Sequence, residues 1–306
     1  MELIVQPDDG LEPVLEAIGA ATKTLDLIIF RFDLKPVEKA LEAAVKRGVA
    51  VRALIAHTNS GGAKRLRQLE QQMLDAGVTV TRTADDLVRY HGKMLIADRA
   101  ALHIFGFNLT ALDLKSRSFG LVCRDRRCVG EGVKLFEADA AKQDYDPSLD
   151  TFVVSPENAR EQLATFIKRA KRQLLIWDPK VSDPQMIRLL QQRAKAGVDV
   201  RVIGKVAKRG NDLKVEKFAG KRLHVRAMVR DSESAFVGSQ SLRALELDGR
   251  REVGMITKDP KVVRRLAEIY ESDWARTPTG AKEAKVLKKE MKEASLDQEL
   301  ATAASR

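Results

Sequence analysis

Residues Tyr90–Leu109 read YHGKMLIADRAALHIFGFNL and place His91, Lys93 and Asp98 in an H-x-K-x-x-x-x-D pattern. Asn108 follows the aspartate by ten residues. The segment is predicted to form two strands, and residues two apart on a strand point to the same face. An imidazole and an ammonium group would therefore lie side by side.

A second copy lies downstream, where residues Leu223–Leu242 read LHVRAMVRDSESAFVGSQSL. His224, Arg226 and Asp231 keep the spacing of the first copy, and Ser241 follows its aspartate by ten residues. The offset between the two histidines is 133 positions (224 − 91). A single match of this kind is weak, whereas two matches with similar strands around them indicate a duplicated unit.

The residues around both copies repeat one alternation of strands and helices. Apolar runs predict buried strands at 25–32 and 49–56, and the pattern restarts at 172–179 after a turn-rich segment at 144–156. Further strands are predicted at 78–83, 101–108, 116–125, 195–205 and 252–256, and helices at 11–22, 36–47, 63–76, 131–142, 157–170, 184–196 and 261–274. This order predicts a parallel or mixed sheet in each half, covered by helices.

The composition suits a globular protein with two packed units. The chain has 306 residues, of which 44% are hydrophobic and 32% charged, and no apolar run approaches a membrane span. The N-terminal sequence lacks the features of a secretory signal. The only cysteines are Cys123 and Cys128, so a disulfide framework is not expected. The cytoplasm is therefore the predicted location, and peripheral association with the inner membrane is also considered.

The formal net charge of +11 favours an anionic partner. Phospholipid headgroups, nucleic acid and other phosphate esters all fit this charge. Aromatic residues make up only 5% of the chain, which argues against a base-stacking platform for single-stranded nucleic acid. Four histidines and two cysteines, scattered along the chain, argue against a structural zinc site, and no metal or other cofactor is expected.

Two facing H-x-K/R pairs would form a pocket with two cations and two titratable rings. Such a pocket fits a phosphodiester, because one imidazole can attack phosphorus while the other protonates the leaving oxygen. His91, Lys93, His224 and Arg226 are therefore the predicted catalytic residues. The two cations would neutralise charge that builds on the phosphate oxygens, and this chemistry requires no metal.

Five residues are candidates for supporting roles. Asn108 and Ser239 are candidate donors to phosphate oxygens. Glu252 lies in a strand expected beside the motif, where it would accept the second N–H of a histidine and fix its tautomer. Asp98 and Asp231 stand at strand ends, and an orienting, structural role is predicted for both.

The paired H-x-K-x-x-x-x-D segments, each followed by a G-S-x-N-like element, resemble the phospholipase D superfamily over residues 8–278. The element AFVGSQSLRALELDGRREVGMI at 235–256 resembles bacterial lipid-type members such as cardiolipin synthases. The resemblance implies two tandem α/β/α sandwich halves, related by a pseudo-twofold axis, with one shared active site. It also implies a phosphohistidine intermediate, a second histidine acting as acid and then base, and phosphate binding by Lys93. His91 is favoured as the nucleophile because its motif is complete.

The chain departs from the family pattern at several positions. Arg226 stands where the family has lysine, and this exchange is not neutral at a phosphate site. The first half keeps the asparagine of its G-S-x-N-like element and lacks the serine, whereas the second keeps the serine and lacks the asparagine. Ser118 occupies the place that corresponds to Glu252. These changes motivate a catalytically impaired scaffold as an alternative, beside a metal-independent nuclease using the same site.

We expect a first half over residues 1–145, a second half over 146–280, and a charged tail, helical or disordered, over 281–306. Because the two halves complete one site within a chain, a monomer is predicted. Phospholipid is the expected substrate class and nucleic acid the alternative, with an anionic membrane surface as a candidate partner. Hydrolysis and phosphatidyl transfer both remain open.

Overall fold

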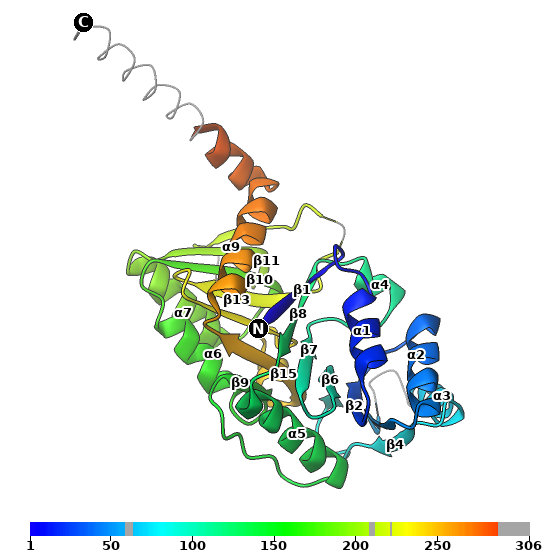
Figure 1. The fold of residues 1–306 in the computed structure, drawn as a ribbon. Coiled ribbons are helices and arrows are strands. Elements are labelled where there is room, and N and C mark those ends of the chain that lie inside the picture. The colour runs from blue at the N-terminus through cyan, green and yellow to red at the C-terminus, as the bar shows by residue number, and fades with distance from the viewer. Residues whose placement is uncertain (59–63, 208–211, 221, 287–306) are drawn as a thin grey trace, which may run out of the picture.

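The computed structural model describes the chain except residues 59–63, 208–211, 221 and 287–306. Two sheets, each flanked by helices, form the body, and the helical segment at 278–286 extends away from it (Figure 1). Residues 278–286 are helical, and they include the described part of the expected tail, 281–286. The remainder of that tail lies outside the described residues.

The first half builds a mixed seven-stranded sheet in the order β1-β8-β7-β6-β2-β3-β4. Its parallel strands are β2 (Thr24–Ile29), β3 (Ala50–Ile55) and β4 (Thr79–Arg82). The antiparallel ones are β6 (Met94–Ala97), β7 (Ala101–Phe105), β8 (Ser118–Cys123) and β1 (Glu2–Gln6). The helices are α1 (Glu12–Ala20), α2 (Lys35–Lys46), α3 (Lys64–Asp75), the short α4 (Ala111–Leu114) and α5 (Arg126–Ala141).

The second half repeats this plan in an eight-stranded sheet with the order β12-β11-β10-β13-β14-β15-β5, and β9 also pairs with β15. Its strands are β9 (Phe152–Ser155), β10 (Gln173–Val181), β11 (Asp199–Val206), β12 (Lys214–Glu216), β13 (Arg226–Arg230), β14 (Ser234–Gly238) and β15 (Arg250–Thr257). Its helices are α6 (Ala159–Lys168), α7 (Pro184–Lys195), α8 (Ala244–Asp248) and α9 (Pro260–Ala275). The predicted pair of α/β/α halves with mixed sheets is confirmed.

The termini of the helices follow local side-chain chemistry. Asp183 caps α7 by accepting from the backbone N–H groups of Gln185 and Met186, and Pro184 supplies the first helical residue. Asp259 and Pro260 begin α9 in the same way. None of the helices among the described residues is long and apolar enough to cross a membrane.

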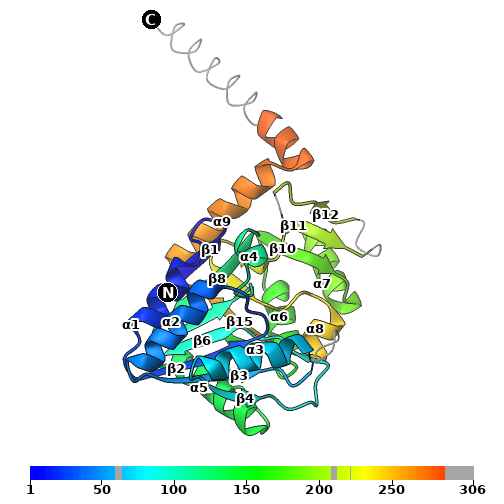
Figure 2. The ribbon, with the colours of Figure 1, turned by 90° about the vertical axis from the view of Figure 1, so that its right-hand side faces the viewer.

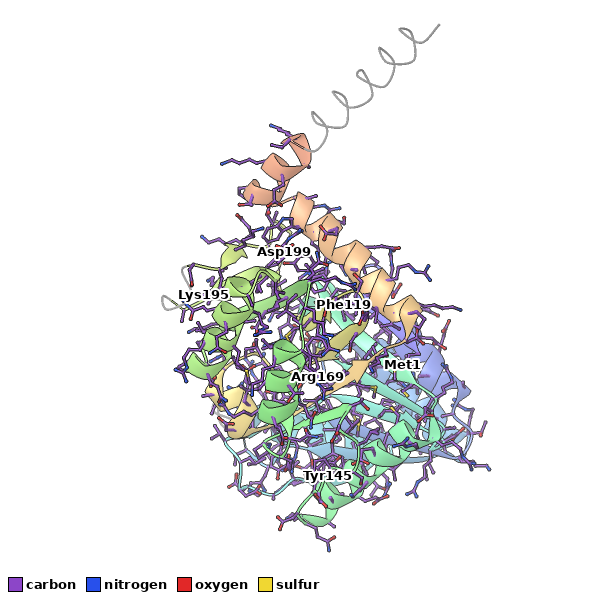
Figure 3. The ribbon with its side chains drawn as sticks, turned by 90° about the vertical axis from the view of Figure 1, so that its left-hand side faces the viewer. Met1, Phe119, Tyr145, Arg169, Lys195 and Asp199 are labelled. Atoms are coloured by element: carbon purple, nitrogen blue, oxygen red, sulfur yellow. The ribbon has the colours of Figure 1, made fainter. Side chains whose placement is uncertain are left out.

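The halves share strands and core where they meet. The short strand β5 (Arg89–Tyr90) leaves the first half and pairs in parallel with Arg250 and Arg251 of β15. Trp177 of the second half packs edge-on against Phe119 of β8, with ring centroids 5.0 Å apart, and the two belong to one buried cluster. Phe119 is labelled in Figure 3, which draws the side chains as sticks. This shared core fixes the position of each half against the other.

Candidate active site

Both motif histidines are tied through their backbone to the opposite half. The N–H of His91 donates to the carbonyl of Arg251 at 2.8 Å, and the N–H of His224 donates to the carbonyl of Arg117 at 3.0 Å. The strand pairing around them is also reciprocal, because β5 joins β15 while Leu223 bridges Arg117. This exchange places both imidazoles at the boundary between the halves.

His91 is held by a carboxylate from the second half. Its Nδ1 lies 2.8 Å from Oε2 of Glu252, which is fully buried on β15, and the ring of Phe30 packs edge-on with centroids 4.6 Å apart. An ionised carboxylate can only accept, so Nδ1 carries the proton. Nε2 then carries the lone pair that can attack an electrophile.

Lys93 lies against the imidazole of His91. Its Nζ donates to the backbone carbonyl of His91 at 2.7 Å and lies 3.2 Å from Nε2 of the same residue. Burial, reinforced by the charge of Arg226, lowers the pKa of Lys93 to about 7. Burial and the charges of Lys93 and Arg226 also lower the pKa of His91 well below its usual value, so this ring is neutral at pH 7.

Arg226 presents a donor that no described residue uses. Its Nη1 is buried and has no hydrogen-bond partner among the described residues, while Nε donates to Oγ of Ser241 at 3.4 Å. A buried guanidinium N–H without an acceptor is costly unless an anion completes it. The guanidinium of Arg226 therefore has a buried donor left over that an anion could accept from.

His224 has a weaker carboxylate contact, from the first half. Its Nδ1 lies 3.4 Å from Oδ2 of Asp113, an ion-pair distance rather than a hydrogen bond. Burial and the neighbouring Arg226 lower the pKa of His224. Burial alone would raise the pKa of Asp113, but His224 and hydrogen bonds from Asn108 and Arg222 hold it below its ordinary value. Asp113 is therefore ionised and lies beside the imidazole of His224.

Asn108 and Ser239 are both engaged by protein groups. The side-chain amide of Asn108 donates to Asp113 at 2.6 Å, and its carbonyl oxygen is buried with no partner among the described residues. The hydroxyl of Ser239 donates to the carbonyl of Val253 at 3.3 Å and lies beside Glu252, whose pKa is raised by burial and lowered in part by Ser239. Both residues therefore contact the groups that hold the histidines.

Asp98 and Asp231 lie at the far ends of the motif strands. Asp98 accepts from three backbone N–H groups at the start of β2, at 2.7–2.9 Å. Asp231 accepts from three at the start of β10, at 2.7–3.0 Å. Both have left-handed backbone φ angles, 52° and 55°, which aspartate tolerates. Their contacts anchor strands and involve no catalytic group.

Sequence reasoning did not select Asp113, nor its counterpart Glu246. Both follow the motif on a short helix, α4 or α8, and each accepts the backbone N–H of the residue at the end of its G-S-x-N-like element at 2.8 Å. The offset between them is again 133 positions (246 − 113). A search for acidic residues repeated at that offset would have found the pair.

The place that corresponds to Glu252 in the first half holds Ser118. Its hydroxyl donates to the backbone carbonyl of His224 at 2.9 Å and does not reach the ring. The carboxylates beside the two histidines therefore differ. Glu252 comes from a strand and lies 2.8 Å from His91, whereas Asp113 comes from a short helix and lies 3.4 Å from His224. Among the described residues, no group of three or more His, Cys, Asp or Glu side chains is arranged to hold a metal ion.

Comparison with known proteins gives one family and several similar structures. A family model described as "Cardiolipin synthase, PLD-like domain" matches residues 14–139 and 163–274. The polyphosphate kinase of Porphyromonas gingivalis superposes with a TM-score of 0.73 at 18% identity, covering 88% of this chain and 46% of the kinase. The phosphatidylserine synthase of Haemophilus influenzae Rd KW20 gives 0.69 at 11% identity, covering 90% and 85%.

These likenesses to solved structures establish the fold. The chain spans less than half the length of the polyphosphate kinase and most of the length of the synthase. No curated protein matches the sequence.

Proposed function

Because the chain belongs to the family described as cardiolipin synthase, phospholipase D-like domain, we propose that it cleaves or transfers at a phospholipid phosphodiester through a phosphohistidine. The contact between Glu252 and His91 supports this most directly, since it leaves Nε2 of a neutral imidazole unprotonated and therefore nucleophilic. The unused guanidinium N–H of Arg226 supports it further as a phosphate ligand.

In the first step, Nε2 of His91 forms a bond to phosphorus while the bond to the leaving oxygen breaks. The ring gains positive charge, which the carboxylate of Glu252 stabilises through Nδ1–H. Lys93 and Arg226 neutralise the charge on the phosphate oxygens.

In this proposal His224 protonates the leaving alcohol. It then removes a proton from water or an acceptor alcohol, whose oxygen bonds to phosphorus while the bond between phosphorus and Nε2 of His91 breaks. The ring must hold a proton before the first step, although Arg226 and Lys93 disfavour it in the free protein. The negative charge of a bound phosphodiester opposes both cations and raises the pKa of His224. Asp113 adds a second anion beside Nδ1.

We expect Glu252→Gln to lower kcat by about 10²–10⁴-fold, because glutamine no longer stabilises the charge that His91 gains. Asp113→Asn removes a contact at 3.4 Å, and its expected loss is about tenfold. Steady-state rates on a soluble phosphodiester measure both, with circular dichroism as the folding control. A larger loss in Asp113→Asn would contradict the assignment of His91 as the nucleophile.

Lys93 predicts a pH dependence of ligand binding. Its pKa is about 7 in the free protein, and an anionic ligand raises it, so Lys93 takes up a proton on binding above pH 7 and none well below it, in addition to the proton that His224 takes up. Affinity for dimethyl phosphate, which stays singly charged, should fall by up to about tenfold per pH unit above pH 7. Calorimetry at pH 6 and 8 in buffers of different ionisation enthalpy counts these protons. Equal uptake at the two pH values would refute the prediction.

The decisive experiment uses vesicles containing anionic phospholipid, incubated with the protein, EDTA and a primary alcohol. Mass spectrometry should detect headgroup-exchanged lipid or phosphatidic acid with the unmodified protein and neither with His91→Asn. Absence of product would overturn phospholipid as the substrate class under these conditions.

A nucleic-acid phosphodiester is the second candidate, favoured by the net charge of +11. Cleavage of labelled DNA or RNA in EDTA, lost in His91→Asn, would support it. If lipid and nucleic acid both stay intact, the impaired-scaffold alternative is favoured, with Arg226 and the divided G-S-x-N-like elements as its motivation.

A further inference from the structure

Exposed apolar side chains gather beside the site. Among the described residues, the large hydrophobic side chains that are exposed are those of Met1, Leu74, Val88, Leu112, Leu245 and Val286. Leu112 is 61% exposed and precedes Asp113, and Leu245 is 38% exposed and precedes Glu246, both of which are buried. The two short helices thus direct an acid inward and a leucine to solvent.

The two leucines hold equivalent places in the halves, at the same offset of 133 positions (245 − 112). Val88, 59% exposed, extends the apolar surface of the second one. Gly249 lies between Leu245 and Val88. A methyl group on its Cα would meet Cδ1 of Leu245 at 3.2 Å and Cγ2 of Val88 at 3.8 Å. Exposed apolar residues scattered singly are ordinary, but a repeated pair flanking one site is not explained by chance exposure.

A groove of about 750 Å³ runs beside Leu112, between the start of α2, the helix α3 and the start of α4. Its wall includes Phe30, whose ring packs on His91, and the basic side chains of Arg31, Lys35 and Arg65. Asp33 and Glu38 also line it. In Figure 2, α3, α4 and α8 are visible on the side of the molecule turned toward the viewer. Leu112 and these cations therefore line one groove, which reaches His91 through the ring of Phe30.

We propose that this surface, formed by Val88, Leu112, Leu245 and the basic wall of the groove, docks on an anionic phospholipid bilayer. The inference rests on the proposed function, because docking would present a lipid phosphodiester to His91. The apolar side chains insert among the acyl chains, and Arg31, Lys35 and Arg65 meet the headgroup phosphates. Nucleic acid would satisfy the cations but leave the leucines in water, so a lipid surface fits better.

Vesicle sedimentation tests this proposal with vesicles of phosphatidylglycerol and phosphatidylcholine, compared with phosphatidylcholine alone. The unmodified protein should bind the anionic vesicles and release with added salt. Leu112→Ser and Leu245→Ser should each weaken partitioning by about tenfold. Leu74→Ser is the matched control, since Leu74 is 47% exposed on α3 and does not line the groove.

Equal loss in Leu74→Ser, or no loss in the Leu112→Ser/Leu245→Ser double variant, would overturn the docking surface. An oligonucleotide that binds both this double variant and the unmodified protein, while vesicles bind neither, would overturn it in favour of nucleic acid. Hydrolysis of bis(p-nitrophenyl) phosphate in solution separates the two proposals. Cleavage without vesicle binding refutes docking alone, whereas leucine-dependent vesicle binding without cleavage of lipid or soluble diester supports docking and refutes the proposed function.

Discussion

Replacing His91 with asparagine is expected to lower phosphodiester turnover by about 10⁴-fold or more, because it removes the attacking atom itself. Asparagine keeps the backbone N–H that donates to Arg251, so the junction between the halves stays intact. The measurement is the rate on bis(p-nitrophenyl) phosphate, with thermal unfolding as the control for folding. Residual activity within about 100-fold of the unmodified protein would exclude His91 as the nucleophile.

His224→Asn provides the informative contrast. p-Nitrophenolate is a good leaving group and needs no protonation, so the first step should still proceed. The second step lacks its base, and the phosphoryl-enzyme should accumulate. We expect a burst of one equivalent of p-nitrophenol and a matching mass increase on the protein.

The adduct should lie on the peptide that contains His91. Its phosphorus–nitrogen bond should be lost in acid and survive in alkali, which distinguishes it from a phosphoserine. A burst in His91→Asn in place of His224→Asn would reverse the two roles and leave the chemistry otherwise unchanged.

The duplicated order of strands and helices could be predicted because it follows from the local pattern of apolar residues and glycines. Buried strands such as β2 and β10 contain apolar runs, at 27–29 and 174–177. Gly48 and Gly197 end the helices before the next strand with positive φ angles of 86° and 87°. A contact between Glu252 and a motif histidine could also be anticipated, because its strand is expected beside the motif, but that the partner is His91 of the other half follows only from the fold.

Other features depend on contacts between distant segments and leave little local trace. The strands β1, β5, β9 and β12 have two to five residues, too few for a periodic pattern, and form because a partner edge is present. Asp113 lies on a helix of four residues, and only the fold brings it to His224. The exposure of Leu112 and Leu245 likewise follows from packing.

A second large effect is expected at the junction between the halves, from Arg251. This residue is 4% exposed, lies 3.0 Å from Asp139 of α5, and also pairs with Glu157 and donates to the carbonyl of Ser155 at 3.1 Å. Arg251→Met should reduce the free energy of unfolding by about 3–5 kcal/mol, because Asp139 becomes a buried charge without its counter-ion. Urea titration measures the change.

The duplicated counterpart supplies an internal comparison. Arg117 of the first half pairs with Asp273 of α9 at 3.1 Å, and Asp273 also accepts from Nε1 of Trp177 at 3.1 Å. Asp139 has no hydrogen bond of that kind among the described residues. Arg117→Met should therefore cost less than Arg251→Met. A larger loss of stability in Arg117→Met than in Arg251→Met would show that the hydrogen bond from Trp177 does not stabilise the charge of Asp273.

The loss in Arg251→Met should grow as pH rises. Burial raises the pKa of Asp139 to about 6 even beside Arg251, above its unfolded value, so this group contributes stability below about pH 4 that is lost as pH rises through 6. Removing the arginine raises that pKa further and extends the loss to higher pH. Unfolding at pH 5 should thus show a smaller difference from the unmodified protein than unfolding at pH 8.

Removing both charges separates the pair from the packing around it. In Arg251→Met/Asp139→Leu no buried charge is left between these positions, so the double variant should be more stable than Arg251→Met alone. Glu157 keeps contact with solvent and tolerates the loss of Arg251 better than Asp139 does, since its side chain is 19% exposed and that of Asp139 is 1% exposed. A double variant as unstable as the single one would place the cost in the lost arginine packing, including its contact with the ring of Tyr90 at 5.6 Å, rather than in the stranded carboxylate.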